Sequence, residues 1–182
     1  MRKVIAAINT TIDGFCDHTA GIADQELHDH YTGLLNNSGV VLYGRVTFEL
    51  MSYWKPFLDK PSGDSSLDDF AKAIDRIPKV IFSHTLSNPH WDTATLAQKP
   101  IQEIVEDLKN QSGKDILVGS RSMINQLMKL KLIDEYQLCI HPVVIGKGLP
   151  LFDENIDRTV FQLTKTKTFK SGAIILHYQK CE

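Results

Sequence analysis

Short runs dominated by apolar residues recur along the first two thirds of the chain. They occupy residues 3–8, 40–43, 79–82 and 115–118, and small or polar residues follow each run. Runs of this length, rich in Val and Ile, are typical of strands that are buried on both faces of a parallel sheet. The pattern therefore predicts four buried strands.

Segments with a helical spacing of apolar side chains lie between these runs. Apolar or aromatic residues recur every three or four positions at 27, 31, 34 and 35, and again at 101, 104, 105 and 108. We expect Ser65 and Ser66 to cap one of the helices and Pro100 to open another. Residues 55–66, rich in Pro, Ser, Gly and Asp, predict a loop. The predicted helices cover residues 24–35, 47–53, 67–77, 100–111 and 122–130.

The last third of the chain has a different pattern. Strand signals at 135–140, 159–169 and 173–179 follow one another without a helical segment, which indicates antiparallel pairing at one edge of the sheet. Lys165, Lys167 and Lys170 fit a solvated edge better than a binding stripe. We expect an α/β fold of three layers, with a central, mostly parallel sheet, helices on both faces and an antiparallel C-terminal edge.

Composition narrows the class of protein. A chain of 182 residues with 42% hydrophobic content can bury one sizeable core, so residues 1–182 are expected to form a single domain. The net charge of −2 gives no reason to expect nucleic acid or an anionic membrane surface as a partner. No apolar stretch reaches the roughly 18–20 residues of a membrane span. Three widely spaced cysteines without a CxxC motif fit free thiols in a reducing cytoplasm.

The residues that follow the strands point to an anionic ligand. In parallel sheets, ligands bind beyond the carboxyl ends of the strands. Here those ends carry small, hydroxylated or cationic residues, and two glycine–arginine junctions open helices, where free N–H groups favour phosphate. Capping by Thr47, Ser120 and Ser122 is the structural alternative. Neither GxGxxG nor GxxxxGK[ST] is present. The four junctions are Asn9-Thr10-Thr11-Ile12-Asp13-Gly14, Gly44-Arg45-Val46-Thr47, Ser83-His84-Thr85 and Gly119-Ser120-Arg121-Ser122.

Six segments, in order along the chain, resemble motifs of the dihydrofolate reductase superfamily. They are TIDG at 11–14, YGRVTFELM at 43–51, KVIFSHT at 79–85, ILVGS at 116–120, LIDEY at 132–136 and PVVIGKGLPLF at 142–152. The last two resemble the branch that includes the C-terminal reductase domain of bifunctional riboflavin-biosynthesis proteins. The resemblance spans nearly the whole chain, and the shared order of six motifs makes it specific.

The resemblance implies a dihydrofolate reductase-like sheet of about eight strands and an NADPH-dependent reductase that acts on a small molecule. It places Arg45 near the 2′-phosphate of the cofactor, the 83–85 turn along the adenosine, and the turn after residue 118 at the pyrophosphate. Relatives are commonly dimers, so a homodimer is expected. The cofactor-binding residues implied are Ala7, Gly44, Arg45, Val46, Thr47, Ser83, His84, Thr85, Val118, Gly119, Ser120, Arg121, Ser122 and Met123.

The sequence departs from the family pattern at two places. Ser120 stands where the family has the second glycine of a pair. The first helix offers His28, Asp29 and His30, without a clean match to the acidic residue of true dihydrofolate reductases. A pyrimidine or pteridine substrate is therefore favoured over folate.

Few side chains present themselves for chemistry. Asp13 is the best candidate for a catalytic or substrate-contacting carboxylate, and Gly14, Glu49 and Trp54 are the other candidates for the substrate side. Each has a structural alternative: a turn aspartate at Asp13, an arginine-paired surface charge at Glu49, and core packing at Trp54. A metal shared by His28 and His30 is not expected, because positions i and i+2 of a helix point to different faces.

The leading hypothesis is a cytoplasmic NADPH-dependent oxidoreductase similar to 5-amino-6-(5-phosphoribosylamino)uracil reductase, with no deaminase domain fused to it. A dihydrofolate reductase proper is the second enzyme hypothesis. A nucleotide-binding module without turnover is the alternative from another class, because hydride transfer requires no diagnostic side chain.

Overall fold

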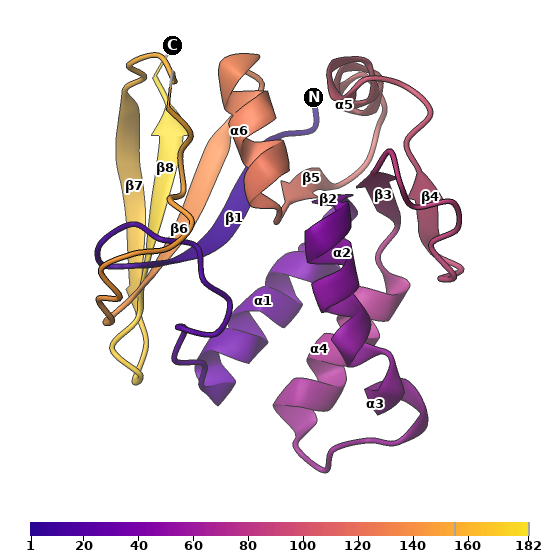
Figure 1. The fold of residues 1–182 in the computed structure, drawn as a ribbon, viewed down its shortest axis with the longest axis vertical. Helices are drawn as coiled ribbons and strands as arrows, with labels where there is room; N and C mark the ends of the chain where they lie inside the picture. The colour runs from indigo at the N-terminus through magenta and orange to yellow at the C-terminus, as the bar shows by residue number, and fades with distance from the viewer. Residues whose placement is uncertain (155, 182) are drawn as a thin grey trace.

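An eight-stranded sheet forms the centre of the computed structural model, which describes residues 1–154 and 156–181. The strands lie in the order β4-β3-β2-β5-β1-β6-β8-β7. The first six of these pair in parallel, and β8 pairs antiparallel with both β6 and β7. Figure 1 shows β6, β7 and β8 at one side of the molecule and β3 and β4 at the other. The mostly parallel sheet with an antiparallel C-terminal edge is confirmed.

The chain alternates strands and helices until its last third. The elements are β1 (Val4–Thr11), α1 (Gln25–Asn37), β2 (Ser38–Gly44), α2 (Arg45–Met51), a 3-10 helix (Ser52–Trp54), α3 (Pro56–Asp59), α4 (Ser65–Arg76), β3 (Lys79–Phe82), β4 (Ala94–Leu96), α5 (Ile101–Lys109), β5 (Asp115–Val118), α6 (Arg121–Lys129), β6 (Glu135–His141), β7 (Phe161–Thr168) and β8 (Ile174–Lys180).

Two large hydrophobic cores lie between the sheet and the helix layers, and a third, smaller cluster packs Leu27 of α1 against Cys139 of β6 and Ile175 of β8. Along β1, Val4, Ala6 and Ile8 pack in the core under α5 and α6, whereas Ile5 and Ala7 pack in the core under α1, α2 and α4. Successive residues of a strand point to opposite faces, so a strand with a helix layer on each side must be apolar at every position. This is why the runs read from the sequence lack alternation.

The sequence-based expectations are wrong or incomplete at four places. Strand β1 continues to Thr11, so Asn9, Thr10 and Thr11 of the first expected junction lie within the strand. The predicted loop at 55–66 contains the one-turn helix α3. Helix α4 is capped by Asp64, whose carboxylate accepts from the Ser66 N–H, and not by Ser65 or Ser66. An aspartate is as good a cap as a serine, and its side chain reaches the second residue of the helix. The short parallel strand β4 was not predicted, because three residues carry too little pattern.

No helix in the described ranges is long and apolar enough to cross a membrane. The cysteines at positions 16, 139 and 181 are free thiols.

Lys79, at the start of β3, is 1% exposed. Its Nζ donates to the carbonyls of Asp75 and Ile77, at 3.2 and 2.9 Å, and to the hydroxyl of Thr93 at 2.7 Å. It also lies 4.3 Å from the centroid of the Trp91 ring. Burial lowers the pKa of Lys79 to about 8. Its hydrogen-bond partners are neutral, and desolvation of the charge outweighs the attraction of the nearby Asp75 carboxylate, while Lys55 lowers the pKa further.

Folding should therefore become more favourable as the pH rises above 8. Because the folded-state pKa of Lys79 lies below its unfolded value, the unfolded chain binds more protons between the two values, and stability rises with pH there. The measurement is the free energy of unfolding in urea of the protein and of the variant Lys79→Met. We expect the difference between the two values, protein minus variant, to increase by about 2 kcal/mol from pH 8 to pH 10. A constant difference would show that Lys79 titrates as an exposed lysine does.

Candidate functional site

A cavity of about 570 Å³ opens at the carboxyl ends of β1, β2 and β5. These strands are neighbours in the sheet, so residues far apart in the sequence meet there. Of the cofactor-binding residues expected from the sequence, those of the 44–47 and 119–123 segments line the cavity, together with Ala7. Ser83, His84, Thr85 and Val118 do not belong to its lining. The site after β2 and β5 is therefore brought together as expected.

The turns after β2 and β5 approach each other closely and share one hydroxyl group. The Ser120 Oγ accepts hydrogen bonds from the Gly44 N–H at 3.1 Å and from the Thr47 hydroxyl at 3.0 Å. A Cβ at Gly44 would lie 2.8 Å from the Ser122 Oγ and 3.1 Å from the Ser120 Oγ, so a larger residue would displace these hydroxyl groups. Ser120 itself has φ −117° and ψ 122°, an extended conformation that serine adopts without strain.

Capping does not explain the hydroxyl groups at these turns. Within the described residues, neither α2 nor α6 has a side chain that caps its first turn. Ser120 instead joins the turn that precedes α6 to the turn that precedes α2. The first N–H groups of both helices are therefore left to a ligand or to water, and residues of both first turns line the same cavity.

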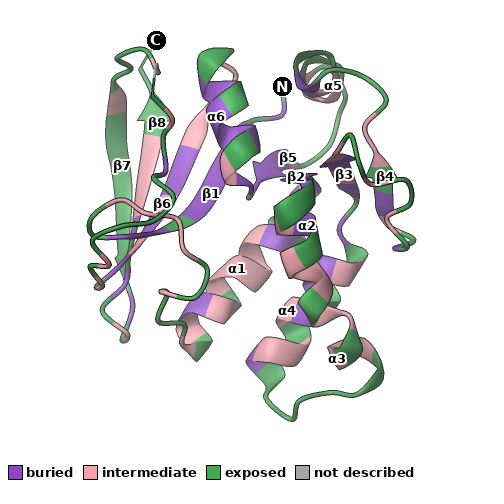
Figure 2. Cartoon of the chain, in the orientation of Figure 1, coloured by how far each residue is buried: buried purple, intermediate pink, exposed green. Residues whose placement is uncertain are grey.

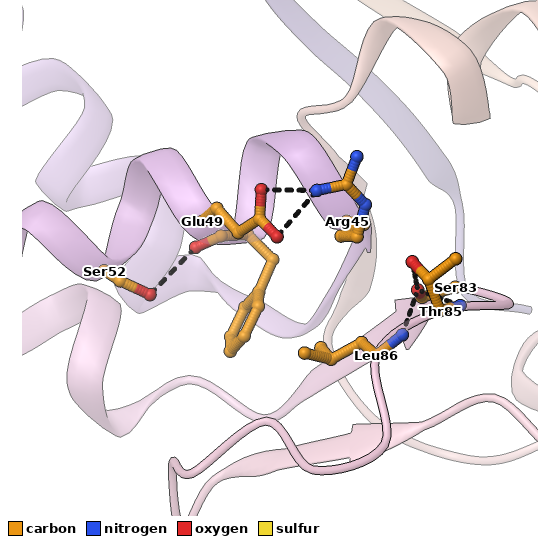
Figure 3. A network of polar contacts seen from close by, with 7 residues as sticks. Arg45, Glu49, Ser52, Ser83, Thr85 and Leu86 are labelled. Atoms are coloured by element: carbon orange, nitrogen blue, oxygen red, sulfur yellow. Dashed lines mark hydrogen bonds and ion pairs between the residues drawn. The ribbon is translucent and has the colours of Figure 1, made fainter.

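The two arginines of these turns have different surroundings. The Arg45 Nη1 lies 2.7 Å from both carboxylate oxygens of Glu49, and the two side chains are 44% and 51% exposed (Figure 3). Arg121 is less accessible: its Nη2 lies 2.6 Å from the Asp153 Oδ1, and its Nε donates to the Pro150 carbonyl. An exposed ion pair is weak and exchanges easily. Arg45 is thus the cation that is free to change partners.

The turn at 83–86 lies next to the start of α2. Gly44 pairs with Phe82 in the sheet, so Arg45 and Ser83 begin adjacent connections (Figure 3). The Ser83 Oγ accepts from the N–H groups of Thr85 and Leu86, at 3.1 and 2.9 Å. This turn is therefore held by its own serine and extends the surface beside Arg45, outside the cavity.

Asp13 lies outside the cavity lining and is tied to another loop. Its carboxylate accepts from the Thr11 hydroxyl at 2.6 Å and from the N–H groups of Ile145 and Gly146, at 3.2 and 2.7 Å. The Thr11 hydroxyl in particular lowers the pKa of Asp13, so the carboxylate is ionised at neutral pH. Gly14 follows with φ +83°, where a side chain would be strained. The roles of Asp13 and Gly14 toward a substrate stay predictions.

Glu49 and Trp54 also lie outside the lining, and only Glu49 matches its structural alternative, because Trp54 is half-buried and lies outside the hydrophobic cores. Glu49 pairs with Arg45. Trp54 packs edge-on against Phe70, with ring centroids 4.7 Å apart, and against His28 and Phe57. Contact of either residue with a substrate stays a prediction. His28 and His30 have different neighbours, since His30 lies against Phe169 and His177.

Sequence reasoning missed the half of the lining that faces α1. There Asn9 of β1 meets Tyr31 and Leu34 of α1 and Phe70 of α4, and Cys16 and Leu149 add a further wall. Asn9 was visible as a polar residue at the end of an apolar run. Tyr31 gave no such signal, because an aromatic residue at helical spacing reads as core.

Comparison with known proteins identifies the relatives of this chain. The model of the RibD C-terminal domain family matches residues 2–175. The uncharacterized protein YyaP of Bacillus subtilis strain 168 is 34% identical over 181 residues, which make up 97% of this chain and 94% of that protein. Protein YwjB of the same organism, also uncharacterized, is 27% identical over 184 residues, with 97% of each chain covered.

Solved structures share the fold. A putative riboflavin biosynthesis protein from Shewanella sp. PV-4 matches with a TM-score of 0.75 and 19% identity, covering 99% of both chains. A pyrimidine reductase-like protein from Corynebacterium diphtheriae matches with a TM-score of 0.69 and 16% identity, covering 100% of this chain and 92% of that one. The Thermotoga maritima diaminohydroxyphosphoribosylaminopyrimidine deaminase/5-amino-6-(5-phosphoribosylamino)uracil reductase matches with a TM-score of 0.68 and 16% identity. This chain is covered to 99% and spans 57% of that bifunctional protein.

Removal of the shared hydroxyl should loosen the two turns. Ser120 is 2% exposed, so Ser120→Ala leaves the buried Gly44 N–H without its acceptor. We expect the free energy of unfolding in urea to fall by about 1–3 kcal/mol, the cost of a buried donor left unsatisfied. Ser122→Ala is the matched control, since it removes only the long 3.4 Å hydrogen bond to the Ser120 Oγ and leaves the bonds from Gly44 and Thr47 in place. Equal losses in the two variants would contradict the bridging role of Ser120.

Proposed function

The chain belongs to the RibD C-terminal domain family, and on that premise we propose that it is an NADPH-dependent reductase of a small heterocyclic substrate of the ribosylaminopyrimidine type. The observation that carries the proposal is the meeting of two uncapped helix starts, at Gly44 and Ser120, over one cavity. The free cysteines support the cytoplasmic location that we propose with it.

The donors around the cavity fit an anionic dinucleotide. The first-turn N–H groups of α2 and α6 would hold its phosphate groups, because both first turns line the cavity and a helix dipole is positive at this end. Arg45, at the rim, would hold the 2′-phosphate, and the 83–85 turn beside it would lie along the adenosine. The apolar floor formed by Ala7, Tyr43 and Leu117 would hold the nicotinamide. NADPH supplies a hydride to an electrophilic carbon of the substrate.

The protein's part in such a reaction is binding, orientation and exclusion of water. Leu149 and Cys16 form a wall of the cavity, and the Cys16 N–H donates to the Leu149 carbonyl at 2.7 Å. Asp13 anchors the same loop through Ile145 and Gly146. We propose that Asp13 acts on catalysis through this loop, in addition to the substrate contact expected from the sequence. The walls of the cavity would then hold the hydride-donating carbon of the cofactor and the acceptor carbon of the substrate about 3–3.5 Å apart.

An assay of NADPH oxidation tests the reaction. We expect oxidation with 5-amino-6-(5-phosphoribosylamino)uracil, the substrate in the name of the Thermotoga relative. Oxidation with dihydrofolate alone would indicate a dihydrofolate reductase proper. Binding of NADPH without oxidation by either compound would leave a nucleotide-binding module.

Arg45 should select NADPH over NADH. Arg45→Ala removes a charged donor at the rim of the cavity, and we expect it to weaken NADPH binding by about 1.5–3 kcal/mol with little effect on NADH. Calorimetric titration of the two cofactors provides the measurement. The control is Glu49→Gln, which frees Arg45 from its ion pair and should leave NADPH binding at least as strong. An equal loss for NADPH and NADH in Arg45→Ala would remove Arg45 from this role.

We further propose that the protein is a homodimer. Beyond α6, apolar side chains of β6, β7 and β8 continue on one face of the sheet, since Leu138 pairs with Leu176 and Ile140 with Ile174. Ile174 is 39% exposed and Leu163 of β7 is 47% exposed. Figure 2 shows β7 largely exposed along its length. A second copy on this face would cover the apolar patch and the free edge.

The protein should therefore sediment at micromolar concentration at twice the 20.5 kDa mass of one chain. Such a dimer would bury more than about 1,000 Å². Ile174→Glu should produce monomers because it places a charge in the apolar patch. Val144→Glu, at an exposed apolar residue elsewhere, should leave the dimer intact. A single species of one-chain mass in the unsubstituted protein would exclude this interface.

A further inference from the structure

A buried histidine next to the cavity has its tautomer fixed by the backbone. His141, the last residue of β6, is 2% exposed, and its Nδ1 lies 3.1 Å from the Ile22 nitrogen. A backbone N–H can only donate, so Nδ1 must carry a lone pair. Burial lowers the pKa of His141, which keeps the ring neutral. Gly21 packs against the same ring, so closely that a Cβ at Gly21 would lie 3.3 Å from the Cε1 of His141. The proton of the neutral ring is therefore on Nε2.

The Nε2–H of His141 fixes the orientation of Asn9. Nε2 lies 3.2 Å from the side-chain oxygen of Asn9, and the Tyr31 hydroxyl donates to that same oxygen at 2.8 Å. If the amide were turned over, its NH₂ group would face the Nε2–H, donor against donor. The other atom near Nε2, the Cys139 sulfur at 3.8 Å, is a weaker acceptor. Two donors thus hold the Asn9 oxygen on the protein side.

The NH₂ group of Asn9 is left for a ligand. Asn9 lines the cavity, and no residue in the described part of the chain accepts a hydrogen bond from its nitrogen. Its strand, β1, is the next one beyond β5, so Asn9 lies past the two turns that would hold phosphate. The walls that α1 and α4 contribute beside it, Leu34 and Phe70 among them, are apolar, whereas Asp17 and His18 add polar groups to the lining after β1. Asn9 is exposed to the cavity, so its pair of N–H donors is open to an acceptor on a flat ligand.

We infer that Asn9 is a specificity-determining residue that donates to a ring carbonyl oxygen of the substrate and disfavours a ring amino group at that position. The inference rests on the proposed function, because it places the substrate over the α1 side of the cavity. An amino group there would meet the Asn9 donors without an acceptor, and a mismatched polar pair in such a site costs affinity of about tenfold or more.

The test compares two pyrimidines of equal size in the NADPH-saturated protein. In 5,6-diaminouracil the ring carries carbonyl groups where 2,4,5,6-tetraaminopyrimidine carries amino groups. We expect the protein to bind the uracil about tenfold more tightly in a titration followed by NMR. Asn9→Asp, which offers acceptors in place of donors, should reverse the preference, and Asn9→Ala should abolish it. Asn37→Asp makes the same chemical change at an exposed position and should have no effect.

Two further readouts separate this inference from the proposed reaction. The ¹⁵N spectrum of His141 should show the neutral ring with its proton on Nε2, and Tyr31→Phe should weaken binding of the uracil while keeping the preference. An equal preference in the protein and in Asn9→Asp, or no preference in the protein, overturns the role of Asn9. If the preference is found but NADPH is not oxidised by the aminouracil phosphate, the reaction falls and the assignment of Asn9 stands.

Discussion

The hydrogen bonds that one buried hydroxyl accepts hold the candidate site together. Ser120 joins the turn after β5 to the turn after β2, and two helices begin from that junction. Because β2 and β5 are adjacent and parallel, their helices start side by side with uncapped N–H groups. A parallel sheet makes such a meeting possible, and the glycine at 44 makes it close. The shape of the cavity follows from this junction.

The rim of the cavity depends on the long segment between β6 and β7. Asn125, 2% exposed on α6, donates to the carbonyls of Arg121 and Leu151 and accepts from the Asp153 N–H. Asp13 holds the other part of the segment through Ile145 and Gly146. The part of the loop that walls the cavity is thus held at two points, by Asp13 of the turn after β1 and by Asn125 of α6, which compensates for its lack of secondary structure.

The sequence predicts the strands buried on both faces well, since a short apolar run between two helical segments seldom forms anything but a buried strand. Lys79–Phe82 and Asp115–Val118 agree in both bounds. The glycine–arginine junctions were also found, because their residue types have a specific use at strand ends. The bridging role of Ser120 was not found from the sequence, since no local pattern shows that its hydroxyl reaches a turn 76 positions away. The contacts of Tyr31 and His141 could not be predicted for the same reason: their partners come from other elements of the fold.

The ion pair of Arg45 and Glu49 changes how binding of an anion would depend on conditions. A free arginine gains the whole attraction of an arriving phosphate, whereas Arg45 must first release a carboxylate 2.7 Å away. The measured affinity would then report the difference between two ion pairs. Salt weakens the ion pair with Glu49 and the ion pair with the phosphate alike, so the effect of salt on the measured affinity partly cancels. At the rim of this cavity an arriving anion therefore replaces the Glu49 carboxylate on Arg45. The selectivity of this exchange comes from the geometry of the two anions more than from their net charge.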